Sequence, residues 1–393
     1  MNNPEDVLIV GLGGAGCRVV ASLMDSASPF DLAVVDTDKT TLAPFDGRPV
    51  TIIRAGTGWA WREGTGCGGD VVRGEQAIAG ERHSITRMMQ GKKLIICAAG
   101  LGGGVSSGGV RTIASVARNL EIPAVFLLTT PFSFESFAKR KNAEKYIEDL
   151  LPIADVVIRL PNDLLFSMLP AETPFDEAFS KSCRELAGCA SGIAAMLNCE
   201  NMLGSDYAGF MEALKGKLSF CGLGVGTAEG SEGLDRCGLA IERMLASPFL
   251  GGISKLEQTD AAIFTVSGGA DLQIGEVKRI FEILQGMLPA ETKLLTGVNI
   301  SESVMDRIQI TAVSIKYDHS KQPAEKEKKG NSPRRKKDHP AVQTDMEQGL
   351  FDLEIYNKGI FSNTPPTMHK GVDLDIPAYQ RNEVYIDKGT TSR

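Results

Sequence analysis

Residues 7–25 read VLIVGLGGAGCRVVASLMD, which is an apolar strand-like run, a glycine-rich turn and a helix-like pattern in direct succession. Glycines at such a junction let backbone N–H groups approach a phosphate at the start of a helix. Gly11, Gly13 and Gly16, with Asp36 twenty residues further on, match the dinucleotide pattern G-x-G-x-x-G. Taken alone, this run is compatible with an NAD-dependent enzyme.

A second glycine run follows another apolar strand-like run and changes that interpretation. Residues 100–109 read GLGGGVSSGG, and a standard dinucleotide site has no use for them. Two backbone-amide loops at the carboxyl ends of neighbouring strands can hold the phosphates of a nucleoside triphosphate, with Ser106 and Ser107 as added donors. A third cluster, GTGCGG at 64–69, would close over the outermost phosphate.

Apolar runs rich in β-branched residues alternate with helical patterns in the first half of the chain. This alternation predicts an α/β fold with a Rossmann-like parallel sheet covered by helices on both faces. The strand-like runs are 7–11, 31–38, 93–100, 124–130 and 156–161.

The rest of the chain divides by pattern and composition. Small and apolar residues recur at helical spacing from about 172 to 197, which predicts one long connecting helix. Strand-like runs at 261–269, 293–300 and 307–315, with a helical pattern at 275–288, predict a second α/β domain. The expected parts are a nucleotide domain at 1–171, the helix at 172–200, the second domain at 201–317, a flexible basic linker at 318–350 and a tail at 351–393.

Composition excludes several classes of protein. The net charge of −7 argues against a nucleic-acid-binding protein, although residues 321–338 carry eight Lys or Arg against three Asp or Glu. Eight cysteines without a C-x-x-C pair and four scattered histidines argue against structural zinc, so no metal ligand is predicted. No apolar run approaches the roughly 20 residues that span a bilayer. We expect a cytoplasmic protein.

The second glycine run, AAGLGGGVSSGGV at 98–110, resembles the signature GGGTGTG of the FtsZ and tubulin family, with Val105, Ser106 and Ser107 replacing Thr, Gly and Thr. The first run is similar to the family's GGGGN, with Ala15 and Cys17 as departures. Further matches, in family order between residues 5 and about 317, are PFSFES at 131–136, NAE at 142–144, LPND at 160–163, SPFL at 247–250 and SGGADLQIGEV at 267–277.

The resemblance implies GTP binding, with Mg²⁺ accompanying the nucleotide. By this resemblance, Glu135 would contact the ribose, and Lys139 stands where the family has an Arg that faces a phosphate. Asn162 would hydrogen-bond the base, and Phe179 would stack on it. Cys183 replaces an Asp or Asn that meets the guanine edge, and a thiol is a weak hydrogen-bond partner, so base specificity would be relaxed. The remaining implied GTP-binding residues are Gly13, Gly14, Ala15, Gly16, Cys17, Gly102, Gly103, Gly104, Val105, Ser106, Ser107 and Gly108.

The resemblance also implies head-to-tail filaments for bacterial cell division, in which a neighbour's N-x-D-x-x-D loop completes the hydrolytic site. Here that loop reads GSDYAG at 204–209: Asp206 remains as the catalytic candidate, while Gly204 and Gly209 replace the Asn and the second Asp. Losing a carboxylate that positions water weakens phosphoryl transfer. We therefore expect slow GTP hydrolysis coupled to polymerisation, with a nucleotide-binding scaffold without useful turnover, or an NAD-dependent enzyme, as the alternatives.

The tail contains DLDIPAYQR at 373–381, which looks like the family's C-terminal partner-binding peptide. Apolar residues beyond a charged spacer have no core to bury them and usually serve a partner's groove. The segment predicts docking to a membrane-tethering protein at the division site. Its candidate contact residues are Asp375, Ile376, Pro377, Tyr379 and Arg381.

Overall fold

The computed structural model divides the chain into two units, residues 1–324 and 325–393. It describes residues 4–26, 28–56, 64–164, 169–170, 172–198, 207–214, 218–232, 235–300, 306–317, 368–369 and 372–373. In the second unit, the described residues form a short antiparallel pair, β11 (Met368–His369) with β12 (Val372–Asp373). The expected linker at 318–350 and the candidate contact residues of the tail lie outside the described residues.

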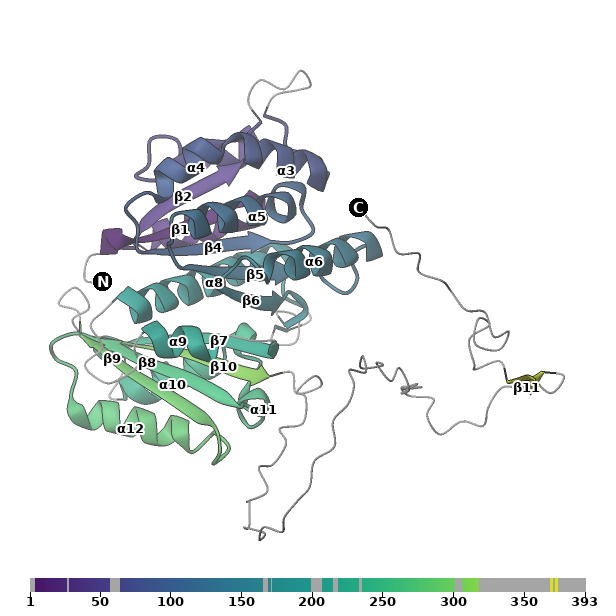
Figure 1. Cartoon of the computed structure of the whole chain (residues 1–393). Helices are drawn as coiled ribbons and strands as arrows, with labels where there is room; N and C mark the ends of the chain where they lie inside the picture. Colours follow the sequence, from purple (N-terminus) through teal and green to yellow (C-terminus); the bar gives the residue numbers. More distant parts are fainter. Residues whose placement is uncertain are drawn as a thin grey trace, which may run out of the picture. The chain divides into compact units, whose positions relative to one another are not determined.

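The first unit opens with a six-stranded parallel sheet in the order β3-β2-β1-β4-β5-β6 (Figure 1). The parallel sheet predicted from the alternating pattern is confirmed. Its strands are β1 (Val7–Leu12), β2 (Asp31–Asp36), β3 (Thr51–Arg54), β4 (Leu94–Gly100), β5 (Ala124–Thr130) and β6 (Val156–Pro161).

Helices cover both faces of this sheet because its central strands β1, β4 and β5 are apolar and buried on both sides. Along β1, Val7 and Ile9 face one core cluster, and Leu8 and Val10 face another. No helix in the described part of the chain is long and apolar enough to cross a membrane. The helices that follow these strands are α1 (Gly13–Asp25), α2 (Lys39–Leu42), α3 (Val71–Gly80), α4 (Arg82–Met89), α5 (Gly104–Asn119) and α6 (Phe137–Leu150).

The long helix expected from the pattern is α8 (Phe175–Asn198), which packs against α1 and against the second sheet. It crosses that sheet closely, because a Cβ at Gly192 would lie 2.6 Å from Oγ1 of Thr311. Ile193 belongs to the core cluster shared by both sheets. The two sheets of this unit are therefore joined through α8.

The second sheet has the order β7-β10-β8-β9, with antiparallel pairs except for the parallel pair of β8 with β9. The strands are β7 (Leu218–Glu229), β8 (Ala261–Gly268), β9 (Lys293–Ile300) and β10 (Arg307–Tyr317). The helices are α9 (Tyr207–Ala213), α10 (Arg236–Leu245), α11 (Ile253–Leu256) and α12 (Ile274–Gln285).

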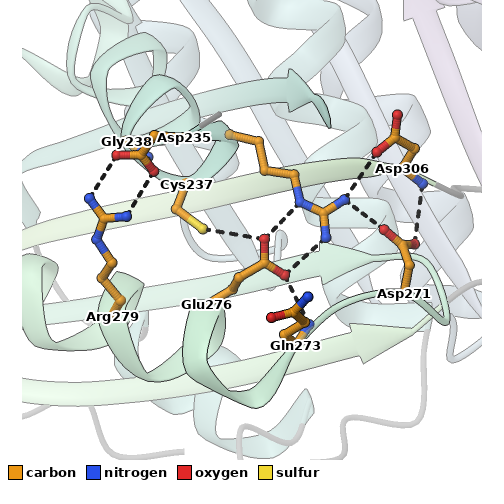
Figure 2. Close-up of polar contacts among 9 residues, drawn as sticks. Asp235, Cys237, Gly238, Asp271, Gln273, Glu276, Arg279 and Asp306 are labelled. Carbon is orange, nitrogen blue, oxygen red and sulfur yellow. Dashed lines mark hydrogen bonds and ion pairs between the residues drawn. The ribbon is translucent and has the colours of Figure 1, made fainter. Parts of the chain in front are cut away.

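The guanidinium of Arg236, at the start of α10, connects three segments of this domain. Figure 2 shows the carboxylates of Glu276, Asp271 and Asp306 that converge on it. Its Nε and Nη2 donate to the two carboxylate oxygens of Glu276, at 2.8 and 2.9 Å. Its Nη1 donates to Asp271 at 2.6 Å and pairs with Asp306 at 3.5 Å. The hydrogen bond from Arg236 holds the pKa of Glu276 below its usual range. Arg236 thus fixes the start of α12 against the turn before β10.

Candidate nucleotide-binding site

The two glycine loops meet at one edge of the first sheet. β1 ends at Leu12 and β4 at Gly100, and the two strands are hydrogen-bonded neighbours with Leu12 opposite Ala99. The loops are joined directly, because Oγ of Ser106 donates a 3.1 Å hydrogen bond to the backbone oxygen of Leu12. The N-termini of α1 and α5 are thereby brought side by side.

Positive φ angles shape both loops. Gly13 has a φ of +72° and Gly102 a φ of +96°, values that residues with a Cβ rarely adopt. At Gly13 the space is also closed, because a Cβ would lie 2.2 Å from Oγ of Ser106. Glycine is therefore required at position 13 by conformation and by contact.

The first turns of α1 and α5 are free of side-chain caps. Neither Leu12 nor Gly103, the residues that precede the two helices, makes a capping hydrogen bond through a side chain. Gly14, Ala15 and Gly103 are exposed, and nothing lies within 4 Å of a Cβ built on Gly14. Exposed N–H groups at two helix starts attract phosphate through hydrogen bonds and the helix dipole. This cradle fits a nucleoside polyphosphate.

Other residues of the two runs are buried behind the loops. A Cβ at Gly16 would lie 2.3 Å from the backbone oxygen of Ala98, so this glycine lets α1 approach β4. Gly104 and Gly108 let α5 approach α3 in the same way, since a Cβ at Gly108 would lie 2.3 Å from the backbone nitrogen of Glu75. Oγ of Ser107 accepts a 2.9 Å hydrogen bond from the nitrogen of Gly102. Val105 is also buried.

Two thiols and a carboxyl group lie near the first loop and the third glycine cluster. Cys17 is buried, and its Sγ lies 3.9 Å from the backbone oxygen of Gly11; burial and nearby Asp36 raise the pKa of the thiol. Sγ of Cys67, in the cluster at 64–69, lies 3.4 Å from Oγ1 of Thr37. Burial raises the pKa of the Asp36 carboxyl, although its Oδ1 accepts a 2.6 Å hydrogen bond from the nitrogen of Thr37.

A cavity of about 620 Å³ opens between α1 and α8. It is lined by Phe179 and Cys183, two predicted base-binding residues that lie one helical turn apart on α8. The ring of Phe179 meets that of Phe132 edge-on, with centroids 5.7 Å apart. Burial raises the pKa of Cys183, while Arg18 and Arg184 act to lower it. The cavity offers an aromatic face and polar groups, as a base site requires.

A second cavity, of about 330 Å³, lies toward the first glycine loop and is lined by Gly14 and Cys17. Arg18 and Ala21 line both cavities. These two residues of α1 therefore border the space from the first glycine loop to Phe179. Arg18 was not predicted, although its spacing with Ala21, Ser22 and Asp25 places all four on one face of a helix.

The remaining predicted residues follow β5 and β6: Glu135 lies in the turn before α6, Lys139 in the first turn of α6, and Asn162 directly after β6. Glu135 accepts from the nitrogen of Phe132 and from Nζ of Lys139, each at 3.0 Å. A Cβ at Gly102 would lie 3.6 Å from the Cβ of Lys139, so Lys139 borders the second glycine loop. The nitrogen of Asn162 donates to the oxygen of Thr130 at 3.3 Å.

The loop predicted for hydrolysis is described only in part. Gly204 and Asp206 lie outside the described residues. Gly209 lies in α9 and is half-buried.

Known protein families match this chain over the regions of both sheets. Residues 6–170 match the model of the tubulin/FtsZ family GTPase domain, and residues 220–317 match that of the FtsZ family C-terminal domain. The cell division protein FtsZ of Pseudomonas putida is 26% identical over 392 residues, which cover 96% of each chain.

Solved structures of this family share the fold. An empty FtsZ dimer from M. jannaschii matches with a TM-score of 0.64 and 23% identity, over 79% of this chain and 87% of that one. CetZ2 from Haloferax volcanii, in a GTPγS-bound protofilament, matches with a TM-score of 0.59 and 19% identity, over 81% and 95%.

The strand order of the first sheet is also that of dinucleotide-binding folds, so topology alone does not separate the two interpretations of the first glycine run. The matches over both domains do separate them, against an NAD-dependent enzyme. The chain belongs to the tubulin/FtsZ family of cytoskeletal GTPases, with the GTPase domain in its first half and the FtsZ-type C-terminal domain after α8.

Proposed function

We propose that this protein binds GTP across the cradle formed by α1 and α5, and polymerises head to tail for bacterial cell division. The observation that carries the GTP-binding part of this proposal is the hydrogen bond from Ser106 to Leu12, because it places the uncapped N-termini of α1 and α5 beside the same space. Two such helix starts suit a chain of phosphates better than a single one does.

The nucleotide's base would enter the cavity between α1 and α8 and stack on Phe179. Glu135 would meet the ribose. Lys139, which is paired with Glu135, would turn toward a phosphate when the nucleotide binds. Asn162 would contact the base from the end of β6.

Hydrolysis would take place between subunits, with Asp206 of one copy positioning water at the terminal phosphate held by the next. Gly209 brings no carboxylate to this reaction, so we expect turnover to be slow. A scaffold that binds nucleotide without useful turnover remains the second candidate, and the same glycine favours it.

Mg²⁺ would bind with the nucleotide. Among the described residues, no group of three His, Cys, Asp or Glu side chains is placed to hold a metal ion. Oxygen atoms of the phosphates are the ligands this ion prefers. When bound, Mg²⁺ would neutralise part of the negative charge of the phosphates.

We further propose that the protein works in the cytoplasm at the division site. The peptide at 373–381 would bind a membrane-tethering partner, and a flexible basic linker would join it to the filament.

The test is the nucleotide content and turnover of the purified full chain. Chromatography of the released ligand should recover GTP or GDP, and added GTP should yield filaments in light scattering and slow phosphate release. Recovery of NAD, or failure to bind added GTP, would contradict the proposal. Filaments without phosphate release would identify the scaffold.

A further inference from the structure

We infer that Arg18 reads the base, by donating to the acceptor edge formed by O6 and N7 of guanine. The inference rests on the proposed function, since it takes the cavity between α1 and α8 as the base site. It assigns specificity to a residue on α1, opposite Phe179.

The first observation is the position of Arg18. Arg18 is exposed on α1, and it lines both the cavity that holds Phe179 and the one that reaches Gly14. A nucleotide with its base stacked on Phe179 and its phosphates at Gly14 would lie alongside the side chain of Arg18. The purine edge, which carries O6 and N7, would then face a guanidinium.

The second observation is that, within the described part of the chain, Arg18 makes no ion pair. Seven other arginines of the same unit pair with carboxylates: Arg48, Arg54, Arg73, Arg159, Arg236, Arg243 and Arg279. In the same cavity, the carboxylate of Asp25 is already engaged by Arg48 at 3.4 Å. The planar fork of Arg18 is therefore available to a ligand.

The third observation is the chemistry of the opposite wall. Cys183 contributes a buried thiol, which is a weak hydrogen-bond donor and acceptor. An arginine fork matches O6 and N7 of guanine in a bidentate contact, and adenine offers a donor in place of O6. Arg18 would therefore supply the discrimination between guanine and adenine that the thiol cannot.

The experiment measures displacement of a ribose-labelled fluorescent GTP from the full chain by GTP, ITP, ATP and 7-deaza-GTP. GTP and ITP carry both O6 and N7, whereas 7-deaza-GTP has a carbon at position 7. We expect GTP and ITP to bind the wild-type protein with similar affinity, and 7-deaza-GTP and ATP roughly tenfold or more weakly.

The variants place this preference on one residue. The Arg18→Ala variant should bind GTP and ITP with roughly tenfold lower affinity than the wild-type protein. It should bind GTP and 7-deaza-GTP with equal affinity, because the residue that contacts N7 is gone. Arg18→Lys keeps the charge without the fork and should also lose the preference. Arg111→Ala, which removes an exposed arginine of α5 that lines neither cavity, is the matched control and should retain the preference.

The outcomes separate the two proposals. If the wild-type protein binds no GTP, the proposed function falls and this inference with it. If it binds GTP and 7-deaza-GTP equally, or if Arg18→Ala keeps the preference, only the assignment of Arg18 is overturned. Arg18 is exposed, so its substitution should not unfold the protein. Circular dichroism of each variant checks that a loss of binding is not caused by unfolding.

Discussion

The hydroxyl of Ser106 and the backbone oxygen of Leu12, 94 residues apart in the chain, form a 3.1 Å hydrogen bond inside the protein. Ser106 is 4% exposed, so removal of its hydroxyl leaves a buried carbonyl without this donor. We expect Ser106→Ala to cost about 1–2 kcal/mol of unfolding free energy and to weaken GTP binding. Denaturant titration and nucleotide displacement measure the two effects.

The control is Ser115→Ala on the same helix, whose side chain accepts a 3.1 Å hydrogen bond from Arg82 at the surface. That change should stay within about 0.5 kcal/mol. An equal loss of unfolding free energy in the two variants would show that the hydrogen bond between the loops stabilises the protein no more than a surface hydrogen bond does.

Neighbouring glycines of the first loop should respond in opposite ways. Gly13→Ala forces a Cβ into a positive φ and against Ser106, so we expect at least about 1–3 kcal/mol of destabilisation without nucleotide. Gly14→Ala meets open space within α1 and should be neutral or stabilise the free protein by roughly 0.5–1 kcal/mol. Thermal unfolding of both variants decides this.

Gly14→Ala should nevertheless weaken GTP binding, because its methyl group enters the space where a phosphate would approach. Unchanged affinity for GTP would mean that the phosphates do not contact the start of α1.

Hydrolysis should increase when a carboxylate is restored at the subunit interface. We expect Gly209→Asp to raise the rate of phosphate release by roughly tenfold or more and Asp206→Asn to lower it. Affinity for GTP in dilute, unpolymerised protein should not change, since both residues would act on the neighbour's nucleotide. A wild-type rate already equal to that of the Gly209→Asp variant would show that another group positions the water.

The stability of the protein should depend on pH through a contact between α8 and the turn that follows α10. Ser247 donates a 3.0 Å hydrogen bond to Glu185, and burial raises the pKa of that carboxyl. A raised pKa in the folded state means that folding favours the protonated acid, so stability decreases as the pH rises through the folded value. Glu185→Gln should therefore stabilise the protein at pH 8, by an amount on the order of 1 kcal/mol, and less at pH 4.

Melting temperatures across this pH range measure the effect, with Glu257→Gln at an exposed position of the same unit as the control. A gain that is independent of pH would show that the ionisation of Glu185 is not its cause.

Removal of residues 373–393 should leave GTP binding and polymerisation intact and abolish recruitment of a membrane-tethering partner. The peptide's apolar residues follow a charged spacer, which suits them to a partner's groove. Sedimentation of filaments and co-sedimentation with the partner separate the two activities. Loss of filaments in a partner-free assay would place the peptide within the polymer.

Strong local patterns made much of the first sheet predictable. The runs of β1, β4 and β5 are apolar on both faces, and these three strands and β6 were each predicted within about one residue of their observed bounds. β3 was missed because it has only four residues, lies at the sheet edge and has two exposed residues, Thr51 and Arg54.

Tertiary packing explains the elements and residues that local pattern missed. β7 contains glycines that lower strand propensity, but a Cβ at Gly226 would lie 1.9 Å from the oxygen of Ala240, so glycine is needed for α10 to pack there. Likewise, the glycine runs carry a recognisable pattern, whereas Arg18 enters the candidate site only because α8 returns to pack on α1.

The pairing of Arg236 with Glu276, Asp271 and Asp306 has a consequence for evolution. Replacement of the arginine alone would leave three carboxylates close together without their shared cation, so the effect of each substitution would depend on the others. We expect relatives that lack this arginine to lack acidic residues at the three partner positions as well. The four positions should therefore change together across the family, although they lie on separate segments of the chain.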